Sequence, residues 1–460
     1  MKPSEASIGL GAQVFDSLRA EYEASWLDRV FVAPTEWNAM TGMRSILVFG
    51  ESGSGKTALN LALTAYAEQT ANVIPVIWKP LLPTLDLIGS ALVQDCAYQI
   101  LNACARALLQ YFGQRPDHFA LAPAWVQDAL HWFLDHCLHE DRQFLLSRLE
   151  DELPPEGFSL IHHLMTTPPM RLVLSSDAPP MRVVAQLMST LRRLGLQGVW
   201  VLVDGLESWL EIERPRMIGL LQAWLAALSF FEDPSFAIKL VVPAALRSAL
   251  MTTGGVSRRR LDVHHLVWTQ ADLIHLVERR LMIASGQDGF CLNDLCPAPD
   301  LTGWLTQFGG SSPRGWLELI RPVADFYLAR SPRIPLAETD WASIRRRYVP
   351  PLHLDLASGR VFIGYGEVTD LGPMVYRVLR YLYEQRPRLC SREELWYRAY
   401  LGHPYQPRGA NDRDWQSQPE WAGTLDTILW RLRRAIEPEL KSPVYIITER
   451  NMGVRLDHTL

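Results

Sequence analysis

An eight-residue segment near the start of the chain constrains the fold more than any other feature. Residues 50–57 read GESGSGKT and match the pattern G-x-x-x-x-G-K-[ST], in which glycines let the backbone wrap a phosphate group. The apolar run 45–49 (SILVF) precedes this segment, and the helix-forming stretch 57–68 follows it. A helix that begins at such a loop attracts anions, because its unpaired N–H groups and its dipole face the phosphate. The sequence therefore predicts a nucleoside triphosphate site.

The roles of the loop residues follow from the same pattern. Lys56 is expected to reach the β- and γ-phosphates, and the Thr57 hydroxyl is expected to hold Mg²⁺. We therefore expect ATP and Mg²⁺ as cofactors. The expected nucleotide contacts in the loop are Gly50, Glu51, Ser52, Gly53, Ser54, Gly55, Lys56 and Thr57.

The composition is that of a globular chain with more than one domain. Its 460 residues exceed one typical core, and 48% apolar and 21% charged residues are ordinary values. The formal net charge of −5 argues against a uniformly basic nucleic-acid coat protein, although it permits a local basic surface. We find no apolar run near the roughly 20 residues that cross a bilayer, and no signal-peptide pattern. The six scattered cysteines favour reduced thiols, so we expect a cytoplasmic protein without membrane attachment.

Strand-like apolar runs alternate with helical periods over residues 1–330, which is typical of an α/β domain. The expected strands are 45–49, 73–78, 199–203, 237–242 and 264–268. The expected helices are about 85–149 with a break at 113–123, 181–194, 270–284 and 313–328, the last two forming a lid over about 270–330. The predicted fold is a P-loop NTPase with a parallel sheet between helices and a helical lid.

A second domain is expected after a linker. Residues 331–351 carry four prolines, which favours an extended connection between domains. The remaining segment, 352–460, has short strand-like runs, three helical stretches and a final pair of strands.

An acidic motif completes the expected nucleotide site. Asp204 follows the apolar run 199–203 and is expected to organise Mg²⁺, while Glu207 is expected to position or deprotonate the attacking water. The alternative interpretations are a polar residue at a strand end for Asp204 and a surface glutamate for Glu207.

The residues VLVDGLE at 201–207 carry a family resemblance. They resemble the hhhDG-h-[DE] motif of the STAND/NACHT group of NTPases and are similar to the acidic motif of origin-recognition-type AAA+ ATPases. The resemblance implies a nucleotide-controlled switch that changes conformation or oligomerises and hydrolyses ATP slowly. In these families, one arginine after the fourth strand and one in the lid contact the phosphates. The matching positions are Arg247 and Arg314.

The C-terminal segment predicts a winged helix, an α+β fold. Its expected helices are 374–385, a second that opens at Ser391, and 424–436, and its expected hairpin is 445–456. In the third helix an apolar stripe faces inward, and Thr427, Trp430, Arg431 and Arg434 face away.

This segment resembles the OmpR/PhoB-type effector domain over nearly its whole length. SREEL at 391–395, TLDTILWRLRR at 424–434 and the hairpin carry the resemblance. It implies that double-stranded DNA meets Thr427, Trp430, Arg431 and Arg434 on the recognition helix and Arg450 on the wing. The sequence departs from that family at Val375, where a glutamate is usual, and in a long insertion, 401–423. The alternative is a winged helix that contacts protein.

Together these features predict an ATP-controlled DNA-binding switch. The first hypothesis is a transcriptional regulator whose STAND/AAA+-like NTPase gates the winged helix. The alternative is an origin-recognition-like, mobile-element or defence ATPase that assembles on DNA with little sequence specificity. We expect slow ATP hydrolysis and an ATP-dependent homo-oligomer. The expected trigger is a partner protein, the DNA itself or the 401–423 insertion.

Overall fold

The computed structural model describes most of the chain as two compact units. One is Arg19–Val267, and the other joins residues up to Leu18 to Trp268–Leu460. The described residues are 13–16, 18–81, 90–171, 173–175, 177–227, 233–252, 261–298, 300–356, 358–407, 409, 411–416, 418–450 and 452–459. Within these ranges, side chains 13, 16, 70, 71, 207, 208, 211, 252 and 418–420 are outside the description.

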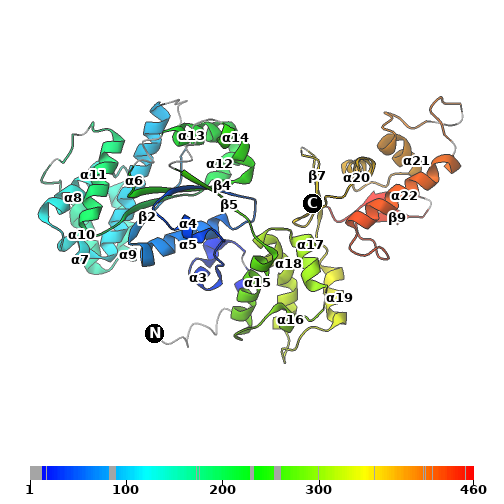
Figure 1. Cartoon of the computed structure of the whole chain (residues 1–460), viewed down its shortest axis with the longest axis horizontal. Helices are drawn as coiled ribbons and strands as arrows, with labels where there is room; N and C mark the ends of the chain where they lie inside the picture. Colours follow the sequence, from blue (N-terminus) through cyan, green and yellow to red (C-terminus); the bar gives the residue numbers. More distant parts are fainter. Residues whose placement is uncertain are drawn as a thin grey trace. The chain divides into compact units, whose positions relative to one another are not determined.

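The first unit is built on a parallel sheet with the strand order β2-β3-β4-β1-β5. The strands are β1 (Ser45–Gly50), β2 (Val73–Trp78), β3 (Gly198–Val203), β4 (Phe236–Pro243) and β5 (Leu261–Leu266). Every residue of β1 and β3 is buried, as expected for strands with both faces covered. Helices lie on both sides of the sheet, with α5 (Lys56–Tyr66) on one side and α12 (Leu206–Ile212) to α14 (Arg247–Thr252) on the other (Figure 1). The predicted P-loop NTPase fold is confirmed.

One predicted strand was misplaced. The run 264–268 was expected to form the last strand, but β5 begins at Leu261 and ends at Leu266. Its register explains the difference, because Leu266 pairs with Gly50, where β1 also ends. Trp268 then precedes Thr269, which caps the next helix.

The helices of the first unit form two groups. Around the loop and sheet lie α2 (Ala20–Glu23), α3 (Leu27–Val30), α4 (Trp37–Met40), α5 (Lys56–Tyr66), η1 (Ala67–Ala71), α12 (Leu206–Ile212), α13 (Arg214–Ala226), η3 (Ala244–Leu246) and α14 (Arg247–Thr252). Between β2 and β3 the chain inserts α6 (Ser90–Gln114), α7 (Pro116–Ala120), α8 (Ala124–Cys137), α9 (Arg142–Glu152), α10 (Pro155–Thr166) and α11 (Pro180–Arg193). This insertion gathers beside β2, the edge strand (Figure 1). The predicted break at 113–123 contains the end of α6 and the short helix α7 and stops where α8 begins, so the helical region is interrupted at Arg115 and again at 121–123.

The second unit begins with a helical bundle. It contains α1 (Gln13–Asp16), α15 (Gln270–Ser285), α16 (Leu292–Leu295), α17 (Leu301–Gly309), α18 (Pro313–Leu328) and α19 (Glu338–Arg347). The helices of the predicted lid lie in the same compact unit as the C-terminal module. The predicted domain boundaries stay predictions.

The predicted linker, 331–351, contains α19. Trp341 and Ile344 on this helix are buried, and the Trp341 indole N–H donates to Asp300 at 2.7 Å. The prolines flank the helix instead of interrupting it, since it fits between Pro335 and Pro350.

The C-terminal module is a winged helix preceded by a small antiparallel sheet. Its elements are β6 (Leu352–Asp355), β7 (Arg360–Ile363), β8 (Gly366–Glu367), α20 (Pro373–Gln385), α21 (Arg392–Glu394), η4 (Leu395–Tyr400), α22 (Gln418–Ile436), β9 (Ile446–Glu449) and β10 (Gly453–Leu456). The hairpin β9–β10 pairs from Gly453↔Glu449 to Leu456↔Ile446. None of the helices in the described part of the chain has the length and apolar content needed to span a membrane.

Candidate functional site

The phosphate-binding loop lies between β1 and α5 in a closed turn. Gly53 and Gly55 have φ of 75° and 89°, a region that glycine enters without a Cβ penalty. A Cβ at Gly50 would come within 2.5 Å of the Ser54 hydroxyl oxygen, so Ser54 would have to move to make room for it. The carbonyl oxygen of Glu51 accepts from the Ser54 N–H at 3.2 Å. The predicted glycine positions therefore have a geometric reason.

Lys56 extends back across this loop. Its ammonium group donates to the carbonyl oxygens of Glu51 at 3.0 Å and Gly50 at 3.5 Å. Phosphate oxygens would be stronger, charge-assisted acceptors for the same group.

Asp204 follows β3 at the same edge of the sheet as the loop. Its backbone N–H donates to the carbonyl oxygen of Trp78 at 3.0 Å. This hydrogen bond keeps the ends of β2 and β3 in register. Its carboxylate lies 3.9 Å from the ammonium group of Lys79. Ligands of open α/β sheets bind outside the carboxyl ends of the strands, where the loop and Asp204 lie.

One small cleft brings the predicted residues together. Lys56, Thr57 and Asp204 line it, and so do Asn60 and Gly205. The hydroxyl of Thr57 and the carboxylate of Asp204 are the hard oxygen ligands that Mg²⁺ prefers. Asn60 adds an amide oxygen that is buried and has no hydrogen-bond partner among the described residues. This donor set fits a hydrated magnesium ion. Among the described residues, no group of three or more His, Cys, Asp or Glu side chains forms another candidate metal site.

Three further residues were predicted to belong to the nucleotide site. Glu207 lies in α12, but its side chain is outside the described residues. Arg247 begins α14 after β4 and is exposed. Arg314 is exposed at the second position of α18, in the other compact unit. The nucleotide contacts expected of these residues stay predictions.

Sequence reasoning missed Asn60. Its signal was a polar residue one turn after Thr57, between Leu59 and Leu63, which are both buried. Its partner, the Val203 carbonyl, is 143 residues away in the chain, so sequence spacing alone gave no indication of the pairing.

Helix α22, the predicted recognition helix, has the two faces expected of it. Its apolar stripe is buried: Leu425, Ile428, Leu429, Leu432 and Ile436. The four residues expected to meet DNA are exposed: Thr427, Trp430, Arg431 and Arg434. Their contact with DNA stays a prediction.

The exposed face carries both charge and aromatic surface. Trp430 is 51% exposed, and the Arg434 guanidinium lies 5.4 Å from its ring centroid, within cation–π range. Within the described part of the chain, neither Arg431 nor Arg434 has an ion-pair partner. Arg450 is exposed in the turn that follows β9. The positive charge is therefore available to an external anion.

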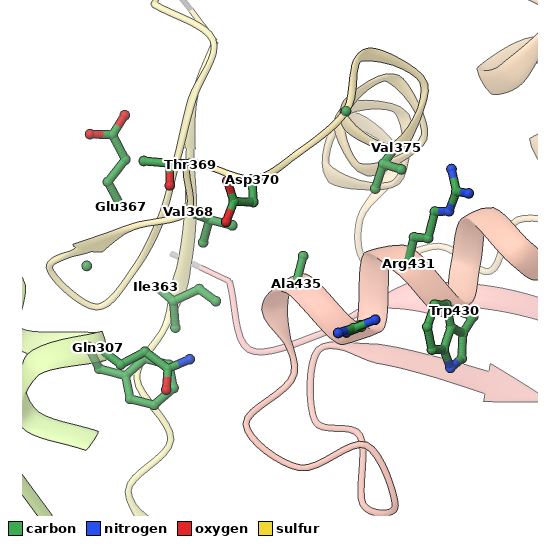
Figure 2. Close-up of a pocket in the computed structure, with 14 residues that line it drawn as sticks. Gln307, Ile363, Glu367, Val368, Thr369, Asp370, Val375, Trp430, Arg431 and Ala435 are labelled. Atoms are coloured by element: carbon green, nitrogen blue, oxygen red, sulfur yellow. The ribbon is translucent and has the colours of Figure 1, made fainter. Parts of the chain in front are cut away.

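A groove of about 820 Å³ adjoins this face. Figure 2 shows Trp430 and Arg431 on α22 at one side, Thr369 and Asp370 from the segment after β8, and Gln307 of lid helix α17 at the other side. Lid, small sheet and recognition helix thus border one continuous surface.

The predicted insertion, 401–423, includes the start of α22 and packs onto the module. Trp396 stacks on Tyr400 and Trp421 with centroid distances of 4.5 and 5.8 Å. Its indole N–H donates to the Gln416 side chain at 3.0 Å. These contacts fix the approach of the chain to the recognition helix.

Comparisons with known proteins found only solved structures of low similarity to report. No family model and no curated protein matches the chain. The DNA-binding domain of RstA from Klebsiella pneumoniae, solved in complex with the RstA box, is 21% identical and covers 24% of this chain and 94% of its own, with a TM-score of 0.19. Cdc6p from Pyrobaculum aerophilum is 14% identical and covers 97% of this chain and 93% of its own, with a TM-score of 0.30.

Proposed function

We propose that this protein is an ATP-controlled DNA-binding switch, and specifically a transcriptional regulator in which the nucleotide state of the P-loop domain sets the DNA affinity of the winged helix. Such control requires contacts that differ between two states. It also requires a physical connection from the nucleotide-sensing residues to the recognition helix.

The observation that carries the proposal is the contact between the lid turn and the small sheet of the winged-helix module. The Tyr365 N–H, between β7 and β8, donates to the carbonyl oxygen of Phe308 in α17 at 2.8 Å. Gly366 lies so close to α17 that a Cβ there would overlap the carbonyl oxygen of Gln307. A Cβ at Gly315 would come within 2.7 Å of the Tyr365 ring. At such close contact, a displacement of the lid turn would also displace the small sheet.

Arg314 belongs to this same contact. Burial, together with a hydrogen bond to Glu318 and the charge of that carboxylate, raises the pKa of Tyr365 to about 12, and the positive charge of Arg314 opposes that shift. The arginine expected to contact ATP therefore lies in the electrostatic environment of a winged-helix residue. Next to Tyr365, β8 leads into the segment that borders Trp430 and Arg431. A shift of Arg314 toward a phosphate would be transmitted along this path.

The matched pair Gly366→Ala and Gly303→Ala tests the connection. The first adds a Cβ that must separate the sheet from α17, whereas the second adds a Cβ to open space in the same lid helix. Small-to-large changes in tight contacts typically cost about 1–3 kcal/mol. We expect Gly366→Ala to bring the ratio of DNA affinities with and without ATP close to one, and Gly303→Ala to leave it at the wild-type value. Equal ratios in the two variants would contradict the proposal.

The second candidate function is an ATPase that assembles on DNA with little sequence specificity. It is favoured by the cationic character of the exposed helix face, since Arg431 and Arg434 suit phosphates as well as bases. Selection from random duplexes with wild-type protein, with and without ATP, separates the two. A consensus sequence supports the regulator, and binding without a consensus, in ATP-dependent oligomers, supports the alternative.

A further inference from the structure

Asn60 is a buried polar residue in the helix that follows the phosphate loop. It is 9% exposed and lies one turn after Thr57. Its amide nitrogen donates to the carbonyl oxygen of Val203 at 3.1 Å, the residue before Asp204. Its amide oxygen is buried without a hydrogen-bond partner among the described residues.

Packing alone does not explain an asparagine here. An unpaired buried polar atom costs about 1–3 kcal/mol, and leucine of nearly the same size would avoid that cost. The neighbours Leu59 and Leu63 show that apolar side chains suit the buried side of this helix. Buried polar atoms of this kind are usually satisfied by water or an ion.

The position of Asn60 suggests what satisfies it. Asn60 lines the same cleft as Thr57 and Asp204. Mg²⁺ keeps several of its waters when protein side chains and phosphates hold it, so the groups around it must accept hydrogen bonds from those waters. Thr57 and Asp204 supply the expected direct ligands, and the Asn60 oxygen supplies a free acceptor beside them.

We propose that Asn60 is a positioning residue of the nucleotide site, whose amide oxygen accepts a hydrogen bond from a magnesium-bound water while its amide nitrogen fixes the strand end that carries Asp204. This inference rests on the proposed nucleotide binding. When bound, the metal would neutralise phosphate charge, and Asn60 would orient one of its waters. Outer-shell groups of this kind typically change metal affinity about 10–100-fold.

The test compares nucleotide affinity with and without the metal. Binding of a fluorescent ATP analogue to the full chain is titrated in Mg²⁺ and in EDTA for wild type, Asn60→Leu, Asn60→Ala and Thr64→Val. Thr64 is the matched control, because its hydroxyl bonds the Asn60 carbonyl at 2.9 Å on the same helix but does not line the cleft. We expect both Asn60 variants to lose about tenfold or more of the affinity gained from Mg²⁺, with the affinity in EDTA unchanged. Thr64→Val should keep the full gain.

Two results would overturn the inference, and they are distinguishable. Asn60 variants that retain the wild-type Mg²⁺ gain, or that weaken binding equally in EDTA, show that Asn60 only supports the fold. Wild-type protein that binds no nucleotide in either condition refutes the proposed function and this inference with it. A urea midpoint without nucleotide, measured for each variant, shows that the compared proteins are folded.

Discussion

Lys239 is a charged residue in the centre of the sheet, and replacing it should destabilise the first unit strongly. The side chain lies in β4 and is 0% exposed. Its ammonium group donates to three carbonyl oxygens, at 2.8 Å to Met40, 2.6 Å to Gly42 and 2.9 Å to Arg44. It also lies 4.5 Å from the ring centroid of Trp200. Lys239 thus anchors the loop that leads into β1 and the phosphate-binding loop.

The size of the stability loss in Lys239→Met follows from the carbonyl oxygens that lose their hydrogen-bond donor. Methionine keeps much of the apolar stem but leaves three carbonyl oxygens without their donor. A buried acceptor without a partner costs about 1–3 kcal/mol. The Gly42 and Arg44 bonds are only partly buried, so water recovers part of that cost. With about 1–2 kcal/mol for each of the three carbonyl oxygens, we expect a loss of about 3–5 kcal/mol.

The loss should also depend on pH. Burial lowers the pKa of Lys239 to about 7, and Asp262 opposes the shift. An unfolded lysine titrates near 10.4, so between these values the unfolded chain binds more protons than the folded one. Stability conferred by Lys239 therefore rises with pH in this window, by at most about 1.4 kcal/mol per unit. From pH 7 to 8 the gap between wild type and Lys239→Met should widen by about 1 kcal/mol.

Urea unfolding followed by tryptophan fluorescence, at pH 7 and pH 8, measures both effects. Lys79→Met is the matched control, since the Lys79 side chain is 70% exposed and should change stability by less than about 0.5 kcal/mol. A loss below about 1 kcal/mol for Lys239→Met would refute the assigned role of the three carbonyl bonds. A gap that stays constant or narrows with pH would refute the assigned pKa.

Two further predictions concern the C-terminal module. The buried Glu437 carboxylate accepts hydrogen bonds from the N–H groups of Val444 (2.7 Å), Tyr445 (3.1 Å) and Ile446 (2.6 Å). Glu437→Gln replaces it with an amide, so the urea midpoint of the module should fall by the equivalent of about 1.5–3 kcal/mol. An unchanged midpoint would contradict this prediction. In Arg434→Ala, the slope of log affinity for duplex DNA against log salt should become shallower by about 1, with folding stability unchanged; an unaltered slope would show that Arg434 meets no phosphate.

Local sequence patterns were sufficient to predict the conformation of the phosphate-binding loop and the buried and exposed faces of α22. The loop needs glycine where φ is positive, as at Gly53 and Gly55. The spacing between these glycines is fixed, so it can be recognised in the sequence alone. The stripe from Leu425 to Ile436 is likewise set by helical period, and its burial confirms the prediction.

Contacts between distant residues could not be read in the same way. Lys239 was read as part of an apolar strand, because its acceptors lie 195 to 199 residues earlier in the chain. The close approach of Gly366 to Gln307 depends on tertiary packing that no local pattern encodes.

Proline positions concealed two helical segments. The prolines around 331–351 favoured an extended connection, but α19 forms between them. The helix α22 was expected to begin at Thr424, but it begins at Gln418, because a proline in the first turn leaves no helical hydrogen bond unmade. The longer helix places Trp421 in the core beside Trp396. The local sequence 418–423 alone does not indicate this burial.

The central claim is tested most directly by the affinity of the full chain for one selected duplex, measured with and without saturating ATP, for wild type and Lys56→Ala. Coupling free energies between sites typically change affinity about 5–150-fold, and the same factor must appear in the ATP affinity measured with and without the duplex. We predict a change in this range for wild type and none for Lys56→Ala. Identical wild-type affinities in the two conditions, with ATP shown to be bound, would contradict the account.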